Sequence, residues 1–426
     1  MRYTTPMARV TAPAPMSSSA PCSSGRLRNA SASRGVRLHT ITGQPRRLEP
    51  PGRTGGARKD FTGFGGRKQE RHTRAAPATG GTGLDWTSIP KVELHLHLDG
   101  SVRPGTLWEL LEERRRRPGG DHGLAPFAAL RSAADVRRWM EVGDQARTLA
   151  EYLSRFELPL AVMQDPESME RIAYELVEDA ARENVRYMEV RFAPILHTRE
   201  GMTMRQAAEA AAAGLQWGGR EFGVGVGVIA CCMRHVDPAD NVAMVREMEP
   251  LLGRGVVAVD LAGDEAAFPG RLHREAFDLA RAMGFNVIIH AGEASGAEEI
   301  RYALETLGAR RIGHGVALEQ DPELMRFVVE EGIPLEMCPS SNVQTKAVAG
   351  LERHPLRRYF DAGVRVTVNT DNRTVSAVTL ADEYERIVEA LGFTADDVRT
   401  MIRYAAEAAF LPGEEKARLI AEVSAG

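Results

Sequence analysis

KVELHLHLDG, at residues 91–100, alternates large apolar side chains with two histidines and an aspartate. Alternate residues of a strand face the same side, so His95, His97 and Asp99 would share one face while the leucines pack on the other. Two imidazoles at this spacing can bind one metal ion, although a strand can also carry two histidines for hydrogen bonding alone. The pattern predicts a buried strand that carries the first part of a site.

Further short β-forming runs follow this stretch, and segments of helical periodicity separate them. Together with the first stretch they lie at 91–98, 185–194, 224–232, 256–263, 286–293, 310–315, 334–342 and 364–371. The amphipathic segments that read as outer helices include 167–184, 271–284, 297–308 and 321–332. Eight strands that alternate with helices predict an α/β fold of the closed (β/α)8 type, a TIM barrel.

The connection between the first two predicted strands is unusually long. It holds helical stretches at 104–117, 133–140 and 148–163 in addition to the crossover helix. We therefore expect a helical insertion after the first strand. It would either cover the mouth of the barrel as a lid or pack against its side.

Residues 1–83 differ from the rest of the chain in charge and composition. They hold fifteen Lys or Arg and three acids, a net charge of +12, so residues 84–426 carry −16 within the formal total of −4. Rich in Arg, Ser, Pro, Gly and Ala, they predict a disordered basic tail ahead of one catalytic domain at 84–426. Three interpretations of the tail are open: upstream sequence included by a misplaced start codon, an organelle transit peptide, or a basic interaction arm. We favour the first.

Composition argues against several kinds of partner. The acidic part disfavours nucleic-acid binding, and no apolar run reaches the ~18 residues that a membrane helix needs. The four cysteines lack the paired spacing of a structural zinc site. We expect a soluble cytoplasmic protein, or an organelle protein if the tail is a transit peptide, that takes a small-molecule ligand. Nothing in the sequence specifies an oligomeric state.

Histidines and one aspartate follow apolar residues at the ends of several predicted strands, and in a TIM barrel these ends form one rim. His95, His97, His290 and Asp371 make a nitrogen-and-oxygen set that suits Zn²⁺ and leaves a position for water. A divalent ion held there makes water nucleophilic at neutral pH. The set predicts hydrolysis or hydrolytic deamination.

The lysines favour one metal ion per chain. Binuclear barrel hydrolases bridge two ions with a carbamylated lysine at the end of a middle strand. After residue 90 the lysines are Lys91, Lys346 and Lys416, and none of them stands at such a position.

Two further strand-end residues are candidates for acid–base work. Glu293 follows His290 in the sequence HAGE, where burial would keep its carboxyl protonated and able to donate to a ring nitrogen. The alternative is an acid at a helix N-terminus near Ser295. His314, between two glycines, would orient the attacking oxygen or take its proton.

Six motifs lie in order along residues 84–426: HLHLDG at 95–100, DLAGDE at 260–265, HAGE at 290–293, RIGHG at 311–315, CPSSN at 338–342 and NTDN at 369–372. Together they resemble the adenosine deaminase family of the amidohydrolase superfamily. The resemblance implies a mononuclear zinc enzyme that converts adenosine, or a close 6-aminopurine nucleoside, to inosine and ammonia.

The resemblance also implies a role for individual residues. The zinc ligands would be His95, His97, His290 and Asp371. Glu293 would protonate the purine at N1, and His314 and Asp371 would assist attack at C6. The substrate contacts would be His97, Asp99 at the ribose hydroxyls, Gly263 at N3 and Asn372 at N7.

Asn372 departs from the family pattern, in which a second acid follows Asp371. An amide donates a hydrogen bond at any pH, so the change either preserves N7 recognition or shifts the substrate to another 6-aminopurine such as adenine or aminofutalosine. The motifs carry no basic phosphate-binding cluster, which disfavours AMP.

Two other classes of protein stay open. A mononuclear zinc amidohydrolase that cleaves an amide or ester does not need the extra acid Glu293. A binding protein without chemistry would not need every catalytic position to be filled.

Overall fold

The computed structural model of the chain describes residues 84–117, 123–143 and 149–425. The basic tail predicted at 1–83 lies outside these residues, so its disorder stays a prediction. No helix within the described ranges is both long and apolar enough to cross a membrane.

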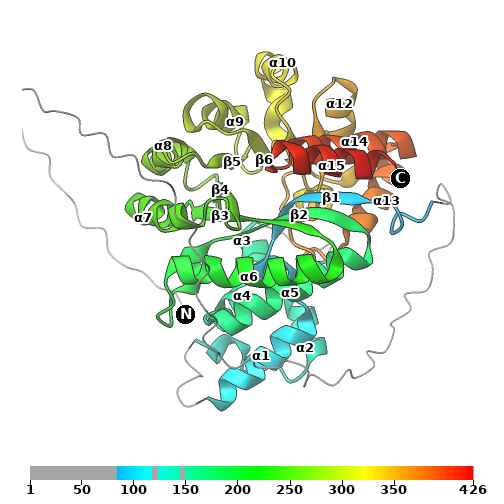
Figure 1. Ribbon diagram of the computed structural model, residues 1–426. Helices are drawn as coiled ribbons and strands as arrows, with labels where there is room; N and C mark the ends of the chain where they lie inside the picture. Colours follow the sequence, from blue (N-terminus) through cyan, green and yellow to red (C-terminus); the bar gives the residue numbers. More distant parts are fainter. Residues whose placement is uncertain (1–83, 118–122, 144–148, 426) are drawn as a thin grey trace, which may run out of the picture. The chain divides into compact units, whose positions relative to one another are not determined.

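Eight parallel strands of the described chain form one sheet in sequential order (Figure 1). They are β1 (Lys91–His97), β2 (Val185–Phe192), β3 (Gly225–Met233), β4 (Val256–Ala262), β5 (Asn286–Ala291), β6 (Arg311–His314), β7 (Leu335–Met337) and β8 (Val366–Val368). Asp371, three residues past the end of β8, closes the sheet: His97 N donates to Asp371 O at 2.7 Å, and Asp371 N donates to His95 O at 2.9 Å. The predicted TIM barrel is confirmed.

The outer helices follow the strands, as the periodicity predicted. They are α5 (Pro166–Arg182), α6 (Met204–Phe222), α7 (Pro238–Met248), α8 (Arg274–Ala282), α9 (Ala297–Tyr302), α10 (Pro322–Glu330), α12 (Leu356–Asp361), α13 (Leu380–Leu391), α14 (Ala395–Ala408) and α15 (Gly413–Ser424). Threonine capping boxes begin α6, α13 and α14 and satisfy amide groups that a helix start leaves unpaired. Because helices cover the outside, both faces of β1 are buried from Lys91 to Leu96.

The seventh predicted run, 334–342, is only partly a strand. β7 ends at Met337, and Pro339–Gln344 form the short helix α11. Pro339 occupies the first turn of α11, where its missing N–H has no helical partner to lose. The polar end of this run is therefore presented to the site by a helix.

The insertion after β1 contains α1 (Pro104–Arg116), α2 (Ala133–Met140), α3 (Leu149–Leu153) and α4 (Glu157–Val162). Tyr152, Leu153, Phe156 and Leu160 from its second half line the cavity at the strand ends. The insertion therefore covers the mouth of the barrel, which confirms the lid interpretation over sideways packing.

Candidate functional site

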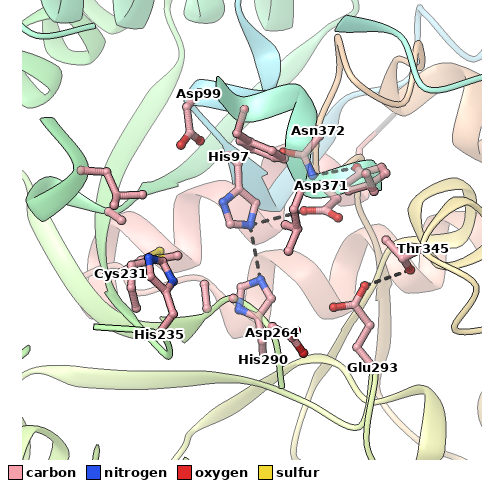
Figure 2. A pocket seen from close by; sticks show the side chains of 18 of the residues that line it. His97, Asp99, Cys231, His235, Asp264, His290, Glu293, Thr345, Asp371 and Asn372 are labelled. Atoms are coloured by element: carbon pink, nitrogen blue, oxygen red, sulfur yellow. Dashed lines mark hydrogen bonds and ion pairs between the residues drawn. The ribbon is translucent and has the colours of Figure 1, made fainter. Parts of the chain in front are cut away.

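A cavity of about 350 Å³ opens at the C-terminal ends of the strands (Figure 2). The predicted site residues that line it are His97, Asp99, Gly263, His290, Glu293, His314, Asp371 and Asn372. His95 is fully buried, with its Nε2 atom 3.5 Å from Asp371 Oδ1. The structure thus brings together all of the residues that the sequence predicted for the site.

Imidazole and carboxylate atoms lie close together at this end of the barrel. Figure 2 shows the His97 ring facing both His290 and Asp371. His97 Nε2 is 3.3 Å from His290 Nε2 and 3.3 Å from Asp371 Oδ1. Two ligands of a tetrahedral zinc ion, each at ~2.1 Å from the metal, would be about 3.4 Å apart. His95 Nε2 and Asp371 Oδ1 are buried and find no hydrogen-bond partner within the described part of the chain. These residues therefore fit a divalent cation.

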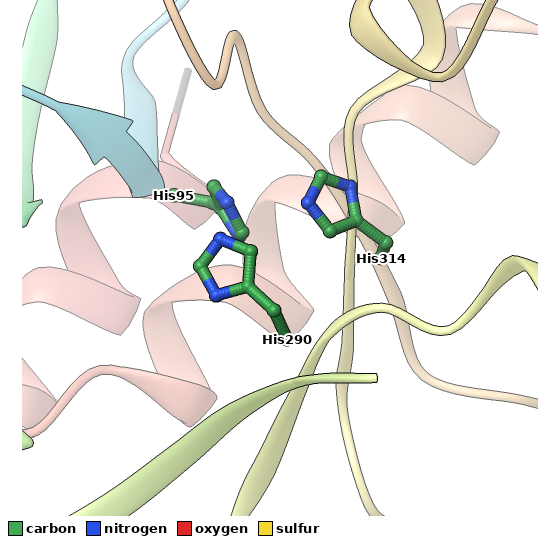
Figure 3. Close-up of side chains that lie close together, drawn as sticks. All are labelled: His95, His290 and His314. Carbon is green, nitrogen blue, oxygen red and sulfur yellow. The ribbon is translucent and has the colours of Figure 1, made fainter. Parts of the chain in front are cut away.

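A fourth imidazole, that of His314, lies close to those of His95 and His290, as Figure 3 shows. The His314 ring lies 4.7 Å from the His95 ring and 5.1 Å from the His290 ring, measured between centroids. The backbones of His314 and Asp371 both lie in the left-handed region, with φ values of 63° and 60°. This conformation costs roughly 1–3 kcal/mol at a non-glycine residue, and such strain is common at functional sites.

The protonation states suit metal binding. Burial lowers the pKa of His97 and of His290, so both imidazoles are neutral and can act as ligands. Burial also lowers the pKa of His95, but its interactions with Asp371 and Glu336 raise it overall, so a proton competes for this position. Burial opposes the ionisation of Asp371, yet the neighbouring His95 and His97 hold its pKa well below the usual range.

Buried charges behind the cluster orient two of its rings. His95 Nδ1 is 3.0 Å from Glu336 Oε2, and His290 Nδ1 is 2.9 Å from Asp260 Oδ2. Arg191 lies between the two acids and donates to Asp260 at 2.8 Å and to Glu336 at 2.6 Å. Carboxylates in this position fix ring orientation and make the imidazole a better ligand.

Glu336 and Arg191 were not predicted from the sequence as site residues, and Asp260 was not given a role. The available signal was a charged residue in the middle of an apolar strand, because such a residue is almost never fully buried unless it is paired. Side chains of Arg191, Asp260 and Glu336 are all completely buried here.

Glu293 faces the cavity from the turn after β5. Its Oε1 accepts a hydrogen bond from Thr345 Oγ1 at 3.1 Å, and its Oε2 lies 3.5 Å from His314 Nε2. The side chain is 12% exposed. Burial, reinforced by the negative charge of Asp371, raises its pKa to about 8. The carboxyl is therefore protonated at neutral pH.

A different acid serves the backbone of this turn. The carboxylate of Glu265 accepts hydrogen bonds from the N–H groups of Gly292, Glu293, Ala294 and Ser295, at 2.7 to 3.0 Å. The alternative interpretation of Glu293, as a helix N-terminal acid near Ser295, is therefore wrong. Glu265 holds the turn, which leaves Glu293 directed at the cavity.

Polar side chains also line the opposite wall of the cavity. Asp99 Oδ1 and Asn372 Oδ1 are buried without a partner among the residues described, and burial raises the pKa of Asp99 to about 7. Asn372 Nδ2 donates to Tyr152 Oη at 2.8 Å, so one N–H of the amide is already used by the lid. A Cβ on Gly100 would lie 1.8 Å from Asn372 Oδ1, so this close approach requires glycine. Gly263 also lines the cavity, and its φ of 109° suits glycine.

Known proteins match this chain over the whole barrel. The family model described as adenosine deaminase matches residues 90–426. An adenosine deaminase from Clostridium acetobutylicum is 41% identical over 334 residues, which cover 78% of this chain and 96% of the relative.

Solved structures agree. An adenine deaminase from Arthrobacter aurescens is 25% identical, with a TM-score of 0.72, and the match covers 79% of this chain and 99% of that one. An amidohydrolase from Burkholderia ambifaria with bound zinc is 26% identical, with a TM-score of 0.71 and coverage of 81% and 94%. Because the family model spans most of the chain and the clostridial relative is similar along nearly its full length, this chain belongs to the adenosine deaminase family.

Proposed function

We propose that this chain converts adenosine and water to inosine and ammonia, with one zinc ion held by His95, His97, His290 and Asp371. The main support for this proposal is Glu293, because its protonated carboxyl lies beside the imidazole of His314. Protonation of a heteroaromatic ring nitrogen requires such an acid. We assign this activity to residues 84–426, since the family match spans 90–426.

Zinc is the proposed ion because of the donor set. Three imidazole nitrogens and one carboxylate oxygen are donors that zinc accepts, and water would be a fifth ligand. The zinc-bound amidohydrolase from Burkholderia ambifaria supports this choice. When bound, the ion would supply a Lewis acid that activates water at neutral pH. Ser341 Oγ donates to Asp371 Oδ2 at 2.5 Å, which directs the other carboxylate oxygen, Oδ1, towards the ion site.

Side chains of the cavity would transfer the proton and position the attacking oxygen. Glu293 would donate its proton to purine N1, which draws electron density from C6 and prepares that carbon for attack. His314, 3.5 Å from Glu293, faces the same point of the cavity. Asp371 stays ionised and positions the attacking oxygen. Water would add its oxygen at C6, with one of its protons passing to the amino nitrogen and the other restoring the Glu293 carboxyl. The bond from C6 to the amino nitrogen then breaks, and ammonia leaves.

We propose substrate contacts for four residues that line the cavity. Asp99 would accept hydrogen bonds from the ribose hydroxyls, and the Gly263 backbone N–H would face purine N3. His97 lies at the wall between the ion site and the sugar. Asn372 would donate to N7 with the N–H that Tyr152 does not use.

The substrate itself is testable with a panel of amines. The full-length chain, loaded with zinc, would be given adenosine, adenine, AMP and aminofutalosine, and deamination would be followed by the change in ultraviolet absorbance. We expect the highest kcat/KM with adenosine. A higher kcat/KM with adenine would move the assignment to the reaction of the Arthrobacter relative, while folded, zinc-loaded protein that turns over none of them would contradict a purine deaminase.

A further inference from the structure

Behind His314, on the side away from the cavity, two buried polar side chains continue its hydrogen bonding. His314 Nδ1 is 3.0 Å from Asn342 Nδ2, and Asn342 Oδ1 is 3.1 Å from His354 Nε2. His354 Nδ1 in turn lies 3.2 Å from the backbone nitrogen of Leu356. All three side chains are at most 2% exposed, so water does not compete for these bonds.

The backbone N–H of Leu356 ends this series of hydrogen bonds, and it sets the direction of each bond between itself and His314. A backbone N–H can only donate, so Leu356 N–H makes His354 Nδ1 an acceptor. Neutral His354 then carries its proton on Nε2 and donates to Asn342 Oδ1. The amide of Asn342 must therefore turn its NH₂ group towards His314, which makes His314 Nδ1 an acceptor as well. The proton of neutral His314 is left on Nε2, the atom that faces Glu293.

The local sequence explains why the Leu356 N–H donates to His354. His354, Pro355 and Leu356 lead into α12, and Leu356 is the first residue of that helix. Its N–H has no partner within the helix and is free to bond to a side chain. Pro355 has no N–H to compete for His354. Burial, with the nearby charge of Arg358, lowers the pKa of His354 to about 3, so its Nδ1 remains an acceptor at neutral pH.

We propose that Asn342 and His354 are positioning residues that fix His314 in the tautomer with its proton on Nε2. The inference rests on the deamination proposed above, and it chooses between the two roles that the sequence left open for His314. An Nε2 that already carries a proton donates a hydrogen bond into the cavity and orients the attacking oxygen. It does not accept a proton from it.

Nitrogen NMR reads the tautomer without any assay of turnover. The full-length, zinc-loaded chain would be labelled with ¹⁵N at histidine, and the His314 signals would be assigned by their loss in His314→Gln. We expect Nδ1 of His314 in the unprotonated range and Nε2 in the protonated range. A protonated Nδ1 in the wild-type chain would overturn the proposal.

Asn342→Asp reverses the bond while it keeps the shape of the side chain. A carboxylate still accepts from His354 but can no longer donate to His314, so the proton of His314 should move to Nδ1. With the donor lost from the cavity, we expect kcat to fall about 100-fold, with KM changed by less than about threefold. Zinc content should be unchanged. The control is Asn286→Asp at the opposite end of the barrel, which should keep wild-type kcat.

His354 gives a second test that does not add charge. Gln can donate to Asn342 from nearly the same position as Nε2, whereas Leu cannot. We expect His354→Gln to retain the tautomer and most of kcat, and folded His354→Leu to lose both. Equal kcat for these two variants, or a wild-type kcat in Asn342→Asp, would overturn the proposal.

The two proposals fail in different ways. If the wild-type chain shows the Nε2 tautomer but does not deaminate adenosine, the proposed function is wrong and the hydrogen-bond assignment stands. If it deaminates adenosine while His314 carries its proton on Nδ1, the positioning role is wrong and the function stands.

Discussion

Glu293 faces the cavity beside the imidazole cluster, and its carboxyl is protonated at neutral pH. Asp371 faces the same cavity but is held ionised by its imidazole neighbours. Two carboxyl groups with pKa values pushed apart can act as acid and as base in one reaction. The geometry therefore separates the proton donor from the group that positions the attacking oxygen.

Replacing Glu293 with Gln keeps the size of the side chain and removes its acidic proton. We expect kcat for adenosine to fall by about 100- to 10,000-fold, the usual contribution of a general acid. Zinc content, measured by atomic absorption, should stay at the wild-type value because Glu293 is not among the proposed ligands. Glu298→Gln, at an exposed acid of α9, is the control. Loss of zinc together with activity would show that Glu293 is structural.

The pH dependence follows from the same carboxyl. Burial raises its pKa from 4.5 to about 8, so the proton that it must donate is lost as the pH rises through about 8. We expect kcat/KM to decrease on this alkaline limb, because kcat/KM reports the ionisation of the free enzyme. The residual activity of Glu293→Gln should lack the limb. The same limb in that variant would assign it to another group.

The sequence identified these residues because each stands in a short local motif. It could not identify Glu336 or Arg191 as site residues, since their partners lie on strands far away in the chain. Nor could it decide the tautomer of His314. That depends on Asn342 and His354, which reach the site from α11 and from the turn before α12.

At the scale of elements, the insertion after β1 completes the cavity that the strands begin. Phe156 and Leu160 supply apolar wall opposite the polar strand ends, and Tyr152 bonds to Asn372. A cover of this kind excludes water from a bound ligand. Helical periodicity predicted the helices of this insertion, but only the structure shows which of their residues reach the cavity.

Shortening Phe156 to Ala tests this cover. Loss of a partly buried aromatic contact, worth about 1.4 kcal/mol, should raise KM for adenosine about tenfold. Phe156 touches no reacting atom, so kcat should change little. Steady-state kinetics would measure both. Phe327→Ala, at an exposed phenylalanine of α10, is the matched control. An unchanged KM in Phe156→Ala would show that the insertion does not contact the substrate.

At the scale of the whole molecule, buried ion pairs connect strands on different sides of the barrel interior. Arg191 from β2 bonds to Asp260 on β4 and Glu336 on β7, and Arg311 from β6 bonds to Glu336 at 2.6 Å and to Glu189 on β2. Through His95 and His290 this network also reaches β1 and β5. The same side chains therefore hold the strands in register and orient the proposed metal ligands.

Arg191→Met would leave two buried acids without their shared cation. Removing one partner of a buried ion pair typically costs about 3–5 kcal/mol of unfolding free energy. Arg186→Met on the same strand breaks the solvent-exposed pair with Glu422 and should cost less than about 1 kcal/mol. Denaturant unfolding compares the two. Equal costs would show that the interior network does not stabilise the barrel.

The eight strands were predictable because each is encoded by its own apolar run, and their alternation with helices specifies a barrel. The end of β7 was not predictable in this way, since the run 334–342 leaves the strand at Met337 and becomes α11 from Pro339 onward. Closure of the barrel was expected from the strand count alone. The structure adds that Asp371 makes this closure through β1, which places the carboxylate beside His95 and His97.

The most direct test of the account is adenosine turnover as a function of bound metal. The full-length chain would be stripped with a chelator, shown to remain folded by circular dichroism, and titrated with zinc while the conversion of adenosine to inosine is followed in the ultraviolet. We predict that turnover is lost on stripping and restored in proportion to zinc, with saturation at one equivalent per chain. Full turnover in the folded, metal-free chain, or none in the zinc-loaded chain, would contradict the account.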